Sequence, residues 1–280
     1  MRYERLHPTS LVLYFFIIAF LPAISQHPVL HAISLIMAAI TLFSWQDTKY
    51  ILKRVPGFLL LFLVISAINP LFYHDGETIL FYLNNRRITL EALLYGADSA
   101  LMILGVCLWF FSFSHFVTSE KILYLFSWAS PKLATIVTMV LRFVPYYSKH
   151  IKAYRAQQRM LGLYGGGSPI EAIRAEGKIF SGFLYWSLEH SMTTANSMAC
   201  RGYGAARRKS FSLFSFKLSD LIMLILIIIN LGLMVYIILN KQAQFTFYPA
   251  LGDISFTTSF CIYVCMYIFT VIIPLTRHRS

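Results

Sequence analysis

Two arginines stand out because a glycine follows each of them closely. In "MACRGYGAARRKS", residues 198 to 210, Arg201 directly precedes Gly202. In "QQRMLGLYGGG", residues 157 to 167, Arg159 comes three positions before Gly162. A guanidinium stays charged and can hold a carboxylate through two hydrogen bonds. Glycine often ends a helix, so both arginines are expected at helix ends.

The chain contains no pattern typical of catalysis. The segment "GGGSPIEAIRAEGK" imitates a phosphate-binding loop, but no glycine stands five residues before Gly177, and Ile179 replaces the required Ser or Thr. Neither GxSxG nor HExxH occurs. No CxxC pair is formed by the four cysteines, Cys107, Cys200, Cys261 and Cys265. We therefore expect no catalytic residue, no cofactor site and no metal site in this chain, and hence no enzyme.

The composition of the chain is typical of a membrane protein. Of 280 residues, 58% are hydrophobic and 13% are charged, which is too apolar for one soluble core. Long apolar segments in lipid must be helices, because lipid satisfies no backbone hydrogen bonds. We predict six spans, the first of them short: Ser10–Ala23, Val29–Trp45, Phe58–Tyr73, Leu90–Phe116, Leu221–Leu239 and Phe256–Leu275. The segments "SQHP" and "QDTKYILKRVP" are expected to be turns, and Pro70 is expected to end the third span.

The distribution of charge predicts the orientation of the chain. If both termini are cytoplasmic, 21 of the 24 Lys and Arg residues lie inside, as the positive-inside rule requires. We expect a multi-pass protein of a prokaryotic cell membrane, with an N-terminal membrane domain at 1–116, a basic central region at 117–217 and a C-terminal membrane domain at 218–280. The central region carries ten of the twelve net positive charges.

Two acidic residues fall inside the predicted fourth span. Glu91 and Asp98 are seven residues apart and share one helix face. Intramembrane acids usually mark a solute pathway or a partner contact. Glu91 follows Thr89 at an expected helix start, where a carboxylate also stabilises the helix dipole. Asp98 is therefore the better candidate for a functional role.

The central region predicts interfacial and cytoplasmic helices. Two apolar pieces, broken at Ser130–Pro131 and interrupted by Pro145, are each marginal for crossing a membrane and are expected at the interface. A basic helix face follows between Lys149 and Gly162, where contact with anionic lipid is the simpler interpretation for most of its charges. A second helix is expected from about Ile170 or Lys178 to Cys200.

A row of small residues marks one face of that second helix. Small residues four positions apart let two helices approach closely, although ordinary packing explains such a row equally well. We expect the two long helices to cross here and to hold Arg159 and Arg201, each at a helix end, as two projecting side chains in fixed positions. The row consists of Ser187, Ser191, Ala195 and Ala199.

Four segments occur in a distinctive order along the chain: "NPLFYHDGETILFYLNNRRITLEALLYG", "LRFVPYY", "RAQQRM" and "ACRGYG". With these motifs, from about Asn69 to Gly204, the chain resembles the T component of energy-coupling factor (ECF) transporters, the EcfT and CbiQ-like family. Such a protein is all-α and polytopic, with two long crossed cytoplasmic coupling helices.

The resemblance implies a role for each arginine. Family members end both coupling helices with Ala-Arg-Gly, and each arginine docks in a groove of one ABC-type ATPase. Cys200-Arg201-Gly202 is similar to the second motif, with cysteine for alanine. Of the first motif, Gln158-Arg159-Met160 keeps only the arginine, and Arg155 is the fallback. This difference leads to the hypothesis that the two ATPases are different chains.

The resemblance further implies a non-catalytic coupling subunit. Its partners would be two ATPases that bind ATP and Mg²⁺, a membrane S component that selects a vitamin or another micronutrient, and the lipid bilayer, with no nucleic acid. The alternative is a self-contained permease or channel, which needs a polar cavity lined by several spans. An intramembrane enzyme is a third alternative, for which the sequence offers no pair of nucleophile and base.

Overall fold

The computed structural model describes residues 6–25, 27–46, 48–72, 78–83, 86–162, 169–204, 214–240, 245–247 and 257–276. Two compact units divide the chain, which we call the first unit (Met1–Ile122 with Phe214–Ser280) and the second unit (Leu123–Leu213). The predicted domains at 1–116 and 218–280 thus belong to one unit, and the second unit lies within the predicted central region.

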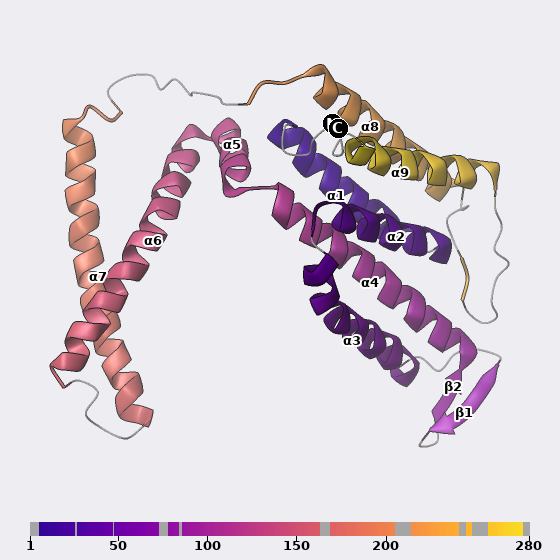
Figure 1. Cartoon of the computed structure of the whole chain (residues 1–280), viewed down its shortest axis with the longest axis horizontal. Helices are drawn as coiled ribbons and strands as arrows, with labels where there is room; N and C mark the ends of the chain where they lie inside the picture. Colours follow the sequence, from indigo (N-terminus) through magenta and orange to yellow (C-terminus); the bar gives the residue numbers. More distant parts are fainter. Residues whose placement is uncertain are drawn as a thin grey trace. The chain divides into compact units, whose positions relative to one another are not determined.

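The first unit is a helical bundle with one small hairpin (Figure 1). Its helices are α1 (Pro8–Ile24), α2 (Pro28–Trp45), α3 (Thr48–Phe72), α4 (Leu90–Phe116), α8 (Leu218–Leu239) and α9 (Thr258–Thr276). The antiparallel strands β1 (Ile79–Leu83) and β2 (Arg86–Thr89) precede α4. The second unit holds α6 (Pro131–Met160) and α7 (Pro169–Cys200), while α5 (Ser119–Ala129) spans the boundary at Ile122.

The described residues include five helices that are long and apolar enough to cross a membrane. These segments are Pro28–Trp45, Ile51–Pro70, Leu90–Phe116, Leu218–Leu239 and Thr258–Leu275. The helix Pro8–Ile24 is apolar but shorter. The prediction of a predominantly helical, membrane-embedded protein is therefore confirmed, and the sixth span stays a prediction.

Three local predictions were wrong. Helix α3 begins at Thr48, so "TKYILKRVP" is helical rather than a turn, and it continues through Pro70 to Phe72. Proline removes one N–H donor but leaves the carbonyl groups free to accept, and membrane helices tolerate this where neighbours compensate. The strands Ile79–Leu83 and Arg86–Thr89 were not predicted. Tyr73 and Phe256, at the ends of two predicted spans, lie outside the described residues.

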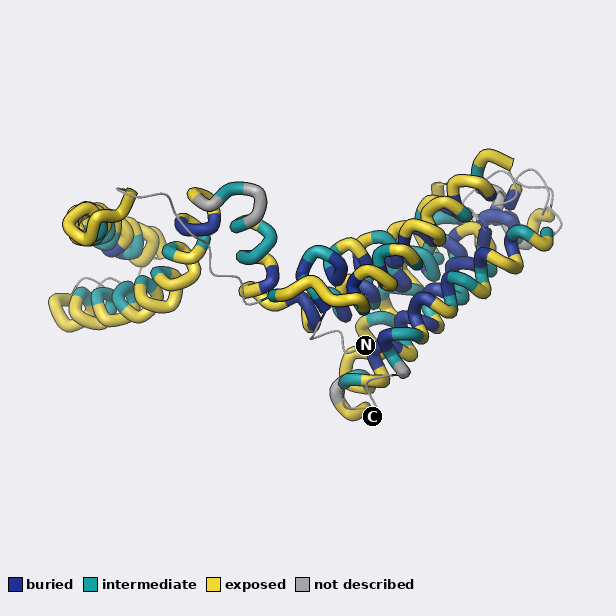
Figure 2. The backbone as a smooth tube through the Cα atoms, turned by 90° about the horizontal axis from the view of Figure 1, so that it is seen from above, coloured by how far each residue is buried: buried dark blue, intermediate teal, exposed yellow. Residues whose placement is uncertain are grey.

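Polar side chains connect the helices inside the first unit. The indole N–H of Trp109 in α4 donates to the hydroxyl oxygen of Ser34 in α2 at 3.1 Å. The Tyr267 hydroxyl of α9 lies 3.1 Å from the same oxygen and 3.2 Å from the carbonyl oxygen of Ile18 in α1. These residues are buried, and Figure 2 colours the buried parts of the bundle dark blue. Because lipid offers no hydrogen bonds, this network fixes how four helices pack.

The N-terminus of α4 is fixed by the hairpin. The Thr89 hydroxyl accepts a hydrogen bond from the Ala92 backbone N–H at 3.4 Å and caps the helix. Glu91 accepts two bonds on Oε1, from the backbone N–H and the hydroxyl of Thr78, at 3.2 and 2.8 Å. The buried Glu91 carboxylate thus anchors the approach to the hairpin, which is a more specific role than stabilising a helix dipole.

Helix α4 lies directly against the backbone of α3 at Gly96. A Cβ atom added there would lie 2.7 Å from the carbonyl oxygen of Ser66 and 3.0 Å from Cβ of Asn69. Gly105, further along α4, has no such constraint, because its nearest neighbours would lie at an ordinary 3.7 Å. Only the first glycine is therefore required by packing.

We expect Gly96→Ala to destabilise the first unit by about 1–3 kcal/mol, because the added methyl group forces α3 away from α4. Gly105→Ala is the matched control on the same helix. It should be neutral or stabilising by about 0.5–1 kcal/mol, since alanine is the better helix former. Thermal unfolding of both variants in detergent measures the difference. Equal stability of the two variants would contradict the packing argument.

Candidate functional site

Helices α6 and α7 form an antiparallel pair in the second unit (Figure 1). The direction follows from contacts that run in opposite order along the two helices. Arg155 pairs with Glu176 at 2.8 Å, the Tyr147 ring lies 5.7 Å from that of Phe183, and the Phe143 ring lies 6.0 Å from that of His190. The predicted break at Ser130–Pro131 is confirmed. Helix α6 then runs unbroken through Pro145 to Met160, so the basic residues from Lys149 onward lie on the same helix as the apolar piece before them.

Aromatic rings occupy the middle of this pair. The indole of Trp186 stacks on His150 with ring centroids 3.7 Å apart, and it also stacks on His190 at 5.3 Å. Gly182 lies so close to Tyr154 that an added Cβ atom would overlap the phenol hydroxyl. Glycine at this position therefore allows the Tyr154 ring to pack flat against α7.

The crossing consequently lies earlier on α7 than the row of small residues predicted. Ser187 is half-buried, but Ser191, Ala195 and Ala199 are exposed. The hydroxyls of Ser187 and Ser191 donate to the carbonyl oxygens of Leu184 and Leu188 in their own helix. We therefore correct the expected crossing to Gly182–Trp186, because large rings rather than small side chains fill the space between α6 and α7.

The end of α7 fixes Arg201. Cys200 is the last helical residue, and Gly202 adopts a left-handed φ of 72°. The N–H of Gly202 bonds the carbonyl of Ala199 at 2.9 Å, and the N–H of Tyr203 bonds that of Met198 at 3.0 Å. These two bonds form a Schellman motif, with Arg201 as the C-cap residue and Gly202 as the left-handed residue. The exposed Arg201 side chain therefore leaves the helix at a fixed position.

The end of α6 has a different register. Gly162 is again left-handed, with φ of 80°, and its N–H bonds the carbonyl of Arg159 at 3.1 Å. Arg159 therefore lies inside the last helical turn, whereas Arg201 is the cap itself. The fallback residue Arg155 pairs with Glu176 at 2.8 Å, and Arg159 stays the predicted docking residue.

The antiparallel arrangement places the two arginines at opposite ends of the pair. Arg155 faces Glu176, and at 1.5 Å per residue the remaining helix lengths separate Arg159 from Arg201 by about 40 Å. The basic residues Arg207, Arg208 and Lys209 lie outside the described residues. Two well-separated arginines suit two binding grooves better than one.

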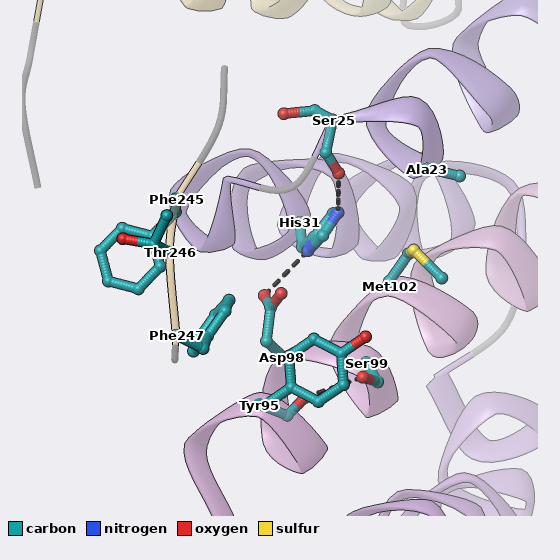
Figure 3. Close-up of a pocket in the computed structure, with 10 residues that line it drawn as sticks. All are labelled: Ala23, Ser25, His31, Tyr95, Asp98, Ser99, Met102, Phe245, Thr246 and Phe247. Carbon is teal, nitrogen blue, oxygen red and sulfur yellow. Dashed lines mark hydrogen bonds and ion pairs between the residues drawn. The ribbon is translucent and has the colours of Figure 1, made fainter. Parts of the chain in front are cut away.

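A second candidate site lies in the first unit, at the end where α4 begins. A cavity of about 400 Å³ contains Asp98 and His31 together with aromatic and hydroxyl side chains (Figure 3). We call it the His31–Asp98 cavity. It is lined by Ala23, Ser25, His31, Tyr95, Asp98, Ser99, Met102, Phe245, Thr246 and Phe247.

The hydrogen bonds of His31 define where its protons lie. Nδ1 is 2.8 Å from Oδ1 of Asp98, while Nε2 is 3.1 and 3.0 Å from the carbonyl oxygens of Pro22 and Ser25. Carbonyl oxygens only accept, so Nε2 carries a proton. One further proton is then shared between Nδ1 and Oδ1. Whichever atom holds it, the pair has no net charge.

The pair also has a structural effect. His31 joins the end of α1 to α2, and its bond to Asp98 joins both to α4. The sequence analysis identified Asp98 but not His31. His31 could have been found by the same criterion, because it is an ionisable residue inside a predicted span. His27, in the turn before α2, is buried, and burial lowers its pKa below the ordinary value, although the Asp98 carboxylate opposes this effect.

Other chemically reactive residues form no cluster in the described part of the chain. The cysteines are free, with Cys107 half-buried and Cys200, Cys261 and Cys265 exposed. Among the described residues, no three His, Cys, Asp or Glu side chains lie close enough to hold a metal ion.

Comparison with models of known protein families gives no match to this chain, and neither does comparison with curated proteins. Functional arguments therefore depend on the geometry of these two sites and on the resemblance of the motifs.

We expect Gly182→Leu to spread α6 and α7 apart, because the new side chain cannot share space with the Tyr154 ring. Spin labels at positions 159 and 201, in a chain whose four cysteines are replaced by serine, report the distance between the ends of the pair. The distance distribution should broaden or shift. Ser191→Leu is the control and should leave the distribution unchanged, since Ser191 is exposed. The opposite result would place the crossing at the small residues.

Proposed function

We propose that this chain is the transmembrane coupling subunit, or T component, of an ECF-type ABC transporter. The single observation that carries the proposal is the end of α7, where a Schellman motif at Gly202 fixes Arg201. An arginine that is the C-cap of a long exposed helix is well placed to bind in a groove of a partner protein. The resemblance of the sequence motifs supports the same interpretation.

In this proposal the antiparallel pair transmits motion. Two cytoplasmic ATPases bind ATP and Mg²⁺ and receive Arg159 and Arg201 in grooves that contain carboxylates. Their closure moves α6 and α7, and the motion tilts an S component that carries a vitamin or another micronutrient. The chain itself supplies no catalytic group. It lies in a prokaryotic cell membrane with both termini cytoplasmic.

The two arginines support a proposal about the ATPases as well. Arg201 is a cap residue, whereas Arg159 lies within the last turn of its helix. Two identical ATPase grooves would be expected to bind arginines at the same position relative to the helix end. The difference in register therefore favours two different ATPase chains.

A self-contained permease or channel is the second candidate function. It requires a polar cavity lined by several helices, and the His31–Asp98 cavity is such a cavity. Purification separates the two candidates, because a coupling subunit is isolated with two ATPases, whereas a permease moves its solute as a single chain.

We expect Arg201→Glu to abolish uptake and to weaken association with the ATPases, while the chain still inserts into the membrane. Loss of one member of a desolvated charge pair costs about 2–5 kcal/mol, because the partner carboxylate remains buried. The measurement is uptake together with the amount of ATPase that co-purifies, at matched expression.

Arg208→Glu is the matched control for general positive charge. A solvated charge near a membrane is worth about 1 kcal/mol, so this variant should keep most of its uptake. Equal loss in both variants would show that overall charge, rather than a directed arginine, holds the partners.

A further inference from the structure

The His31–Asp98 cavity combines a carboxylate with aromatic rings. Oδ1 of Asp98 is bonded to His31, while Oδ2 has no hydrogen-bond partner among the described residues. Figure 3 shows the rings of Tyr95 and Phe247 beside this carboxylate. The Phe247 ring lies 5.3 Å from that of Tyr95 and 4.7 Å from that of Phe245. The cavity therefore presents a carboxyl oxygen and aromatic surface together.

This combination selects among classes of ligand. An anion is disfavoured by the Asp98 carboxylate. A transition metal is disfavoured because both ring nitrogens of His31 are already engaged in hydrogen bonds. An organic ammonium ion gains from both components, since its charge pairs with a carboxylate and its carbon groups pack on aromatic rings.

We propose that the His31–Asp98 cavity binds a small organic ammonium ion, which enters in exchange for the proton shared by His31 and Asp98. This site is independent of the coupling function proposed above. It adds a ligand to a chain whose motifs otherwise indicate only protein partners.

The exchange balances in protons and charge. Before binding, the pair is neutral and holds one proton between Nδ1 and Oδ1. When the cation enters, that proton leaves to water, and the Asp98 carboxylate turns from Nδ1 toward the cation, because two acceptors with no proton between them repel each other at 2.8 Å. His31 keeps its Nε2–H, which still donates to the carbonyl oxygens of Pro22 and Ser25, and the ionised Asp98 pairs with the cation. The occupied site is again neutral, so binding adds no net charge to the low-dielectric interior.

Other ionisable groups surround the pair. His27 lies in the turn before α2, and burial holds its pKa below the ordinary value. Tyr95 lies on α4 and lines the same cavity. Glu91 lies one helical turn before Tyr95 and accepts a hydrogen bond from the Thr78 hydroxyl. Helix α9 packs on α2 and carries the buried phenols Tyr263 and Tyr267, neither of which lines the cavity. Of the groups named here, only His31 and Asp98 form a carboxylate–imidazole contact.

Choline is a suitable probe because it remains cationic at every pH. The full chain in lipid nanodiscs is titrated with choline and, separately, with its neutral analogue in which carbon replaces the charged nitrogen. We expect saturable binding of choline, at least about tenfold tighter than that of the analogue. Calorimetry in buffers of different ionisation enthalpy should show release of one proton per choline. Because binding releases a proton, the affinity should rise with pH.

Variants test the assignment of residues. Asp98→Asn should remove choline binding and proton release, and Phe247→Leu should weaken binding while proton release persists at saturation. Glu91→Gln is the matched control, because it removes a buried carboxylate from the same helix but not from the cavity. It should bind choline as the unmodified chain does.

Three results would overturn the proposal: no saturable binding to the unmodified chain, equal binding of the neutral analogue, or binding without proton release. Loss of the pH dependence in His27→Gln would assign the proton to His27 and would overturn it too. If Asp98→Asn fails to fold, the titration of the unmodified chain and the Phe247→Leu variant still decide the question.

Discussion

The first unit depends on one buried hydrogen bond, between Nδ1 of His31 and Oδ1 of Asp98. Lipid cannot compensate a polar group that lacks a partner, so each of these side chains requires the other. Together with the bonds from Nε2 to Pro22 and Ser25, this contact sets where α1 ends, how α2 begins and how α4 packs on both. The same end of the bundle holds the cavity, so packing and ligand chemistry involve the same two side chains.

Much of this architecture could be predicted from the sequence, because the bilayer leaves few alternatives. Long apolar segments had to be helices, and Gly162 and Gly202 had to end theirs, since both positions require a left-handed backbone. The turn predicted before Phe58 and the stop predicted at Pro70 were wrong. Proline interrupts hydrogen bonding at one position only, and packing of α3 against α4 outweighs that cost.

Contacts between distant residues could not be predicted in this way. His31 and Asp98 are 67 positions apart, and no local pattern relates them. The crossing of α6 and α7 illustrates a second limit. Small residues and aromatic rings can both let helices pack, and spacing alone did not show that the rings around Trp186 form the contact. The Gly182 position becomes informative only once Tyr154 is known to face it.

The crossed pair has a mechanical consequence. Two stiff helices can turn about the place where they touch, and Tyr154 and Gly182 put that contact near the C-terminal end of α6 and closer to the middle of α7. Helices resist shortening, so a force that moves the end of α7 relative to the end of α6 must change the angle between the two helices. Because α6 extends much further before the contact than after it, a small movement near Arg159 becomes a larger one at the first turn of that helix. The ratio of the two movements is set by where the contact lies along α6.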